Sequence, residues 1–115
     1  MFNHMVDNQA ERLDLLFHAL SDATRRGILQ QLTGVEKTVG EIAQPYEMSL
    51  AAVSKHLRVL ERAALVAITR KGNHRFARLR AETLGVAREW LGYHDRFEQA
   101  RLDALAESLG GEEPA

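Results

Sequence analysis

Apolar residues recur every three or four positions over most of this 115-residue chain. This spacing gathers side chains on one face of an α-helix. The first such group predicts an amphipathic helix over about residues 9–20: Leu13, Leu16, Phe17 and Leu20. A second helix is predicted over about residues 23–32, because Ser21 or Asp22 can accept hydrogen bonds from its first backbone N–H groups. Gly34 then stands where a helix commonly ends.

The middle of the chain predicts two further helices joined by a tight turn. Thr38 and Glu41 form a capping-box pattern, and Pro45 limits the helix that they begin to about residues 39–44. Ser49 is expected to cap the next helix, whose buried stripe would be Leu50, Val53, Leu57 and Leu60. Its opposite face is small or basic: Ala51, Ser54, Lys55, Arg58 and Arg62. Together these features predict a helix-turn-helix over about residues 38–63.

After the helix-turn-helix the apolar period changes. Residues 74–79 alternate in the manner of a β-strand, and Gly72-Asn73 is a signal for a tight hairpin turn. A basic β-hairpin is therefore predicted over about residues 65–80. A helix-turn-helix followed by such a hairpin is a winged helix, and the hairpin is its wing.

A long last helix is predicted over about residues 82–107. Six of its residues form a heptad-like seam: Val86, Trp90, Tyr93, Phe97, Ala100 and Ala104. The seam packs either on its own domain or on a partner, and we favour a twofold homodimer because the winged-helix core is small. Residues 108–115 are expected to be a disordered tail.

The predicted fold is mainly α with a small β-hairpin, and it forms one winged helix-turn-helix domain over residues 9–107. The terminal helices are expected to form a dimer interface that contains Leu13, Leu16, Phe17, Val86, Trp90, Tyr93 and Phe97.

Composition excludes several classes of function. The absence of cysteine removes disulfides, thiolate catalysis and cysteine-based metal or redox sensors. No nucleophile–base pair stands out, and the five histidines are scattered, so we do not expect an enzyme. There is neither an apolar run of membrane-spanning length nor a signal-peptide pattern, so a cytoplasmic location without membrane contact is expected.

The near-neutral total charge conceals a strongly basic segment. Residues 49–80 contain eight lysines and arginines but a single acid, Glu61, whereas the rest of the chain carries seven basic and fifteen acidic residues. A basic stretch can be an ordinary solvated face. Here the acids are almost absent over 32 residues, which favours a surface for a polyanion, most commonly a nucleic acid.

Three segments carry a family resemblance: LFHALSDATRRGILQQL, TVGEIAQPYEMSLAAVSKHLRVLERAALV and the wing TRKGNHRFARL. In order and spacing they resemble the ArsR family of bacterial winged-helix transcriptional regulators over roughly residues 13–95. The resemblance implies a homodimer of five-helix subunits with a β-wing, and a repressor that leaves its operator when an inducer binds.

The resemblance also implies where double-stranded DNA would bind. Residues 49–58 match the groove-reading helix and residues 70–75 match the wing, and the candidate contacts are Ser49, Ala51, Ala52, Ser54, Lys55, His56, Arg58, Arg62, Arg70, Lys71, Asn73 and Arg75. Alanines permit close approach and can contact a thymine methyl, whereas polar tips reach base edges and phosphates. His56 can instead pack against the first helices, and Ser49 can act only as a cap. Arg25 and Arg26 fit a salt-bridge role as well as DNA contact.

Two positions depart from the family pattern. Residues 40–44 lack the cysteines of arsenic, cadmium and lead sensors, and His94-Asp95 lacks the second histidine of the zinc and nickel sensors. We therefore expect neither a metal site nor a cofactor. Ala64 stands where the family usually has glycine, and a left-handed backbone there would cost on the order of 1 kcal/mol.

The sequence thus predicts a sequence-specific DNA-binding regulator, expected from the family to be a homodimeric repressor with an inverted-repeat operator. The alternative is a winged-helix module that binds an acidic protein and has no DNA specificity. A small organic inducer near Trp90 and Tyr93 and the absence of any inducer are both open. The operator sequence, the regulated genes and the direction of regulation are not encoded in any pattern of the chain.

Overall fold

The computed structural model describes the backbone of residues 2–110 and the side chains of residues 8–110. The chain divides into two compact units, residues 1–84 and residues 85–115. The first unit holds every element except most of the last helix, and the two units are described separately below.

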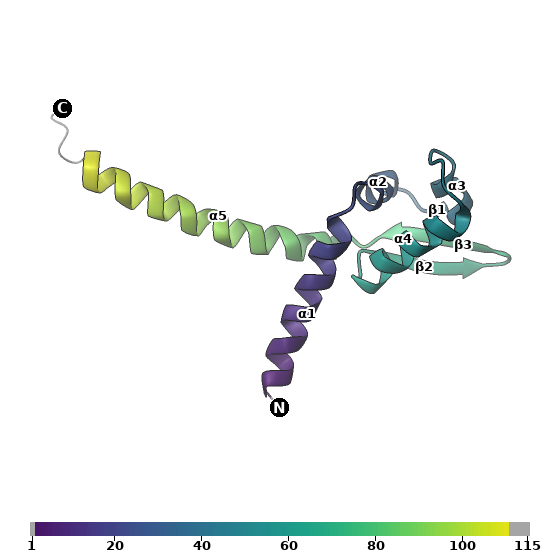
Figure 1. The fold of residues 1–115 in the computed structure, drawn as a ribbon, viewed down its shortest axis with the longest axis horizontal. Helices are drawn as coiled ribbons and strands as arrows, with labels where there is room; N and C mark the ends of the chain where they lie inside the picture. The colour runs from purple at the N-terminus through teal and green to yellow at the C-terminus, as the bar shows by residue number, and fades with distance from the viewer. Residues whose placement is uncertain (1, 111–115) are drawn as a thin grey trace. The chain divides into compact units, whose positions relative to one another are not determined.

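The first unit contains four helices and a three-stranded sheet (Figure 1). Its elements are α1 (Phe2–Leu20), α2 (Ala23–Gln31), β1 (Lys37–Thr38), α3 (Val39–Ala43), α4 (Leu50–Arg62), β2 (Val66–Lys71) and β3 (His74–Leu79). Helices α3 and α4 with the β2–β3 hairpin are the predicted winged helix-turn-helix. Helix α1 begins before residue 9, so the prediction of its start was wrong.

Local sequence explains where the central elements begin and end. Asp22 caps α2, Thr38 and Glu41 form the predicted capping box of α3, and Ser49 caps α4. Gly34 has a φ of 76°, as expected for a residue that ends a helix. The two-residue turn Gly72-Asn73 has a positive φ only at Gly72, which fits a type II′ hairpin turn.

The sheet has the order β1-β3-β2, and both pairings are antiparallel. Strand β1 was not predicted, because two residues are too few to show an alternation. It pairs Lys37 with Ala77 and Thr38 with Phe76. This short strand fixes the start of α3 to the root of the wing.

The core lies between the helices and the root of the sheet. Its largest fully buried side chains are Ile28, Leu32, Ile42, Val53, Leu60, Leu65 and Val66. Burial of each such side chain contributes about 1.5–3 kcal/mol. Leu16 is also buried and packs in the core of its own chain, so the prediction that places Leu16 at a dimer interface is wrong.

Leu50 is the exception in the predicted stripe of α4. Val53, Leu57 and Leu60 are buried, but Leu50 is 58% exposed, so its predicted burial was wrong. It is the first residue of α4, one turn before the part of the helix that packs on the core. The apolar periodicity predicted which face of α4 is buried, but it did not predict that the packing on the core begins only after the first turn.

Ala64 has a φ of 61°. It therefore adopts the left-handed backbone conformation that was considered above because glycine is usual at this position. Its N–H donates to the Glu61 carbonyl at 2.9 Å, and its carbonyl accepts from the Thr83 hydroxyl. These bonds hold the chain reversal that leads from α4 into β2.

The last helix, α5, extends over Ala81–Gly110. Residues 108–110 are helical, so the predicted disordered tail begins too early, and residues 111–115 lie outside the described part. Within residues 2–110, no helix combines the length and the apolar content that a membrane crossing requires.

Candidate nucleic-acid interface

The outer face of α4 is small and basic. Ala51, Lys55, Arg58 and Arg62 are exposed, and they project from the side opposite the buried Val53, Leu57 and Leu60. Ala52 is partly covered, at the edge of this face. The face therefore offers close backbone approach at its N-terminal end and positive charge along its length.

Ser49 begins this helix. Its Oγ accepts the Ala52 N–H at 3.1 Å, with the extended backbone typical of an N-cap. The hydroxyl proton is not used in this bond, so Ser49 can still donate to a second partner. The cap and a phosphate contact are therefore compatible roles.

Ser54 connects α4 to the wing. The Arg75 guanidinium donates to Ser54 Oγ at 3.3 Å, and both side chains lie at the surface. This bond joins the helix and the hairpin across 21 residues of sequence. It presents the outer face of α4 and one side of the wing as one basic surface.

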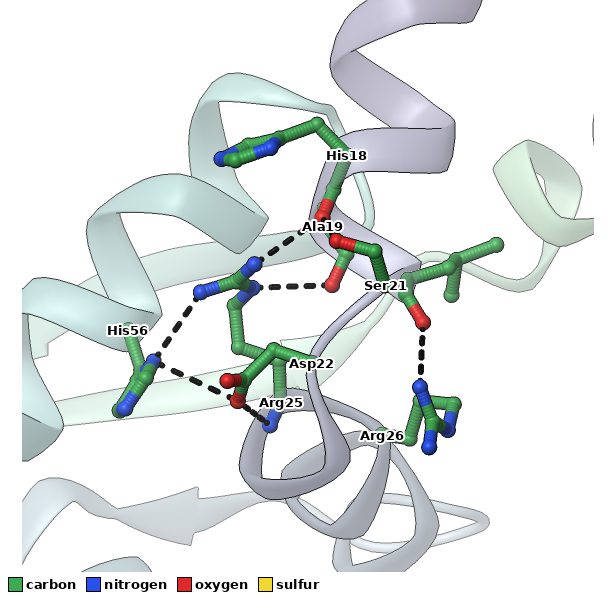
Figure 2. A network of polar contacts seen from close by, with 8 residues as sticks. His18, Ala19, Ser21, Asp22, Arg25, Arg26 and His56 are labelled. Atoms are coloured by element: carbon green, nitrogen blue, oxygen red, sulfur yellow. Dashed lines mark hydrogen bonds and ion pairs between the residues drawn. The ribbon is translucent and has the colours of Figure 1, made fainter.

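His56 lies on the other flank of α4, where it meets α2 (Figure 2). Arg25 Nη1 donates to His56 Nδ1 at 3.3 Å, and Asp22 Oδ2 lies 3.9 Å from the same nitrogen. A guanidinium carries only donors, so Nδ1 is the acceptor. The structure places His56 in the packing between α2 and α4, which is the second of the two interpretations given above.

Arg25 is the centre of this network and is buried. Its guanidinium donates to the carbonyls of Ala19 and His18 at the end of α1, at 2.9 and 3.0 Å (Figure 2). Arg26 donates in the same way to the Leu20 carbonyl at 2.8 Å. Both arginines thus satisfy the last carbonyls of α1, and Arg25 holds α1, α2 and α4 together.

The Asp22 carboxylate is the third member of the network of Arg25 and His56. The Arg25 backbone N–H donates to it at 3.0 Å and holds the pKa of this carboxyl below its ordinary value, and the positive Arg25 guanidinium lowers the pKa further. Asp22 therefore stays ionised when α2 is formed.

The wing carries two arginines at directly paired positions. Arg70 on β2 is opposite Arg75 on β3. Arg70, Arg75 and Asn73 at the turn are exposed. Like charges facing each other across two strands destabilise a hairpin. Such an arrangement favours an anion that neutralises both arginines.

Lys71 is engaged differently from the other wing cations. Its Nζ donates to Glu36 Oε1 at 2.8 Å and lies 5.1 Å from the centre of the Phe76 ring. Glu36 lies in the loop before β1, so this pair holds the wing against that loop. Of the predicted contact residues, Ser54 of α4 and Arg75 of the wing are in direct contact. Lys71 follows Arg70 on β2 and therefore points to the other face of the hairpin, and His56 is turned inward.

The exposed seam of α5 is the second predicted surface. Val86, Trp90, Tyr93 and Phe97 are all exposed, and the Trp90 ring stacks on His94 at 4.1 Å between centroids. His94 Nδ1 lies 3.0 Å from the Trp90 carbonyl oxygen. No group of three histidine, cysteine or acidic side chains within the described part of the chain is close enough to hold a metal ion.

The sequence interpretation missed a second apolar stripe on α5. Leu91, Leu102, Leu105 and Leu109 are exposed and lie about 130° around the helix from the first seam. The signal was present as spacings of three and four after residue 102. It was hidden because His94 and Glu98 interrupt the stripe.

Known proteins share this arrangement. A family model described as a helix-turn-helix domain matches residues 20–69. The transcriptional repressor SdpR of Bacillus subtilis is 36% identical over 76 residues, which cover 66% of this chain and 84% of SdpR.

Solved structures agree with the sequence relatives. The crystal structure of an ArsR family transcriptional regulator matches with a TM-score of 0.73 at 30% identity, over 76% of this chain and 97% of that one. The solution structure of a homodimeric winged helix-turn-helix DNA-binding domain from Mycobacterium bovis matches with a TM-score of 0.62 at 26% identity, over 95% of this chain and 92% of that one. The helix-turn-helix, the basic wing and these relatives together show that the chain belongs to the ArsR family of winged helix-turn-helix transcriptional regulators.

Proposed function

We propose that this protein is a homodimeric repressor that binds double-stranded DNA in the cytoplasm and recognises an inverted-repeat operator. The observation that carries the proposal is the hydrogen bond from Arg75 of the wing to Ser54 of α4, which brings basic side chains of the two elements beside each other. A single α-helix fits the major groove, and a basic hairpin beside it can follow the phosphates.

The side chains suit a division of labour on DNA. Ala51 and Ala52 would permit close approach of α4 to the base edges, and Lys55 would reach a guanine edge or a phosphate. The remaining contacts would be mainly to the backbone: Ser49, Ser54, Arg58, Arg62, Arg70, Asn73 and Arg75. Lys71 would join them after exchanging Glu36 for a phosphate, and His56 would act chiefly by orienting α4.

The exposed seam of α5 supports the dimer. Val86, Trp90, Tyr93 and Phe97 repeat at spacings of four, three and four, as in a helix that packs on another helix. Leu13 and Phe17 of α1 are the other residues predicted to contribute to a dimer. The Mycobacterium bovis relative is itself described as homodimeric. A twofold dimer would present two groove-reading helices to half-sites about one helical turn apart.

Repression follows from the family and from SdpR, whose name describes a repressor. A dimer bound over a promoter would block access to it without any catalytic step. An acidic protein partner is the competing occupant of the basic surface. It would use the same charges but would give no preference among DNA sequences.

Selection from a pool of randomised duplexes separates these two functions. Purified full-length protein, carried through several rounds, is expected to enrich an inverted repeat with half-sites about one helical turn apart. Lys55→Ala should weaken or abolish the enrichment, whereas Arg88→Ala on α5 removes an equal charge outside the basic surface and should not. A pool that stays random in sequence would contradict the proposal and favour the protein-binding module.

A further inference from the structure

Leu50 is an apolar side chain on a surface that is otherwise polar and basic. At 58% exposure it is the most exposed large apolar side chain described in residues 8–84, ahead of Val35 at 48% and Leu15 at 37%. One exposed leucine is ordinary in a folded protein. Its position gives it meaning, since it is the first residue of the helix proposed to enter the groove.

The neighbours of Leu50 define what it can touch. Ser54 and Arg58 follow at i+4 and i+8, so the three side chains form one row along α4. Ser54 in this row accepts a hydrogen bond from Arg75 of the wing. Ala51 is exposed beside Leu50. An apolar patch of these two residues therefore stands at the N-terminal end of α4, one turn before Lys55 and Ser54, the latter bonded to Arg75 of the wing.

Only one group in the major groove is complementary to this patch. Phosphates, sugars and most base edges there are charged or polar, whereas the thymine C5-methyl is apolar. A polar edge opposite Leu50 would lose water without gaining a partner. An exposed leucine at this place thus favours a methyl-bearing base.

We propose that Leu50 is a specificity-determining residue that contacts the C5-methyl of one thymine in each half-site; this rests on the DNA-binding function proposed above. Leu50 distinguishes thymine from cytosine and uracil at that position by the methyl group. It accepts 5-methylcytosine for the same reason, because that base carries a methyl group at the same place in the groove.

Deoxyuridine substitution tests the proposal because it removes only the methyl group and keeps the base pair. In the selected duplex, each thymine is replaced in turn, and affinity is measured by fluorescence anisotropy. Burial of one methyl is worth about fourfold in affinity, so wild-type protein should lose about fourfold at a single position of each half-site. Symmetric replacement in both half-sites should cost about fifteenfold.

Variants at position 50 assign the effect to this side chain. Leu50→Ala should bind the thymine duplex more weakly and should not distinguish it from the deoxyuridine duplex. Leu50→Met keeps an apolar side chain and should keep the preference. Val35→Ala is the matched control, because it shortens another exposed apolar side chain outside α4. Thermal unfolding should be the same for all three variants, since both residues are exposed.

Three results would overturn the proposal, and they differ in what else they overturn. Full methyl discrimination by Leu50→Ala, or no discrimination at any thymine by the wild type, would show that Leu50 does not read a methyl, while specific binding to the selected duplex would stand. Failure of the wild type to prefer any duplex would overturn this inference and the proposed function together.

Discussion

Ala64 is the one non-glycine residue with a positive φ among the described residues, and it stands where α4 turns into β2. A Cβ in the left-handed region costs roughly 1–2 kcal/mol, which glycine avoids. Ala64→Gly is therefore expected to raise the free energy of unfolding by about 1 kcal/mol, measured by urea denaturation. Gly34→Ala provides the reverse control, because Gly34 has a φ of 76° and open space around it. An Ala64→Gly variant that is no more stable would show that this turn is not strained.

Asp22 gives stability a defined dependence on pH. Its pKa in the folded chain lies below the ordinary value of 3.8, so its contribution is complete above that value and is lost as pH falls through the folded pKa. The free energy of unfolding should therefore decline as pH falls below about 4. Asp22→Asn keeps a capping side chain but removes the charge, so its decline should be shallower in urea titrations at several pH values. An equal decline would assign the effect to other carboxyls.

Sequence reasoning succeeded at single residues where the chemistry is local. The capping box of Thr38 and Glu41 and the cap at Ser49 depend on residues within three positions of each other, and the structure contains all of them. Leu16 and Leu50 were misassigned because burial depends on what a distant element covers. The Arg25–His56 contact spans 31 residues and was not predicted for the same reason.

At the level of elements, the wing combines a known fold with an unfavourable charge pattern. Arg75→Glu would place a carboxylate opposite Arg70 and replace repulsion with attraction, worth about 0.2–1 kcal/mol across a strand pair. We expect this variant to be at least as stable as the wild type in thermal unfolding. Its affinity for the operator should nevertheless fall tenfold or more, because a phosphate contact is lost in each protomer.

Arg88→Glu is the matched control for the wing variant. Arg88 is exposed on α5 and undergoes the same reversal of charge. Its affinity for DNA should change little. A loss of stability in Arg75→Glu, or an equal loss of affinity in both variants, would contradict the assignment of the wing to phosphate contact.

The positions of the helices and the hairpin could be predicted from the sequence, but strand β1 and the second apolar stripe of α5 could not. Long apolar periods and turn residues identified α2, α4, β2 and β3 within a residue or two. Strand β1 forms only because Lys37 and Thr38 pair with residues of β3 that lie 38–40 positions farther along the chain. The second apolar stripe of α5 was not predicted because polar residues interrupt it.

For the whole molecule, the central prediction about assembly concerns α5. Phe97 is 58% exposed on the seam proposed to pack in the dimer. Phe97→Glu would bury a charge there, so we expect monomers at concentrations at which the wild type is dimeric in sedimentation equilibrium. Far-UV circular dichroism should show that helix content is kept.

Gln99→Glu controls for the added charge on the same helix. Residue 99 lies about 160° around α5 from residue 97, so this variant should remain dimeric. A dimeric Phe97→Glu variant would place the interface elsewhere. If the monomeric Phe97→Glu variant bound the full inverted repeat as tightly as the wild type, dimer formation would not be required for DNA recognition.

The general class of function was evident from the distribution of charge and from the order of motifs, since seven net positive charges lie within residues 49–80. The structure adds that Arg75 of the wing contacts Ser54 of α4, so basic residues of the two elements lie beside each other. No pattern in the chain identifies the operator, because base preference depends on how a few side chains fit groups in the groove.

Sequence-specific DNA binding is the central claim, and fluorescence anisotropy tests it most directly. The titration compares a labelled duplex from upstream of the protein's own gene with a scrambled duplex across a series of salt concentrations. We predict at least tenfold tighter binding to the upstream duplex, with log affinity falling by about 0.9 per phosphate contact for each unit of log salt. No binding to either duplex at low salt would contradict the claim.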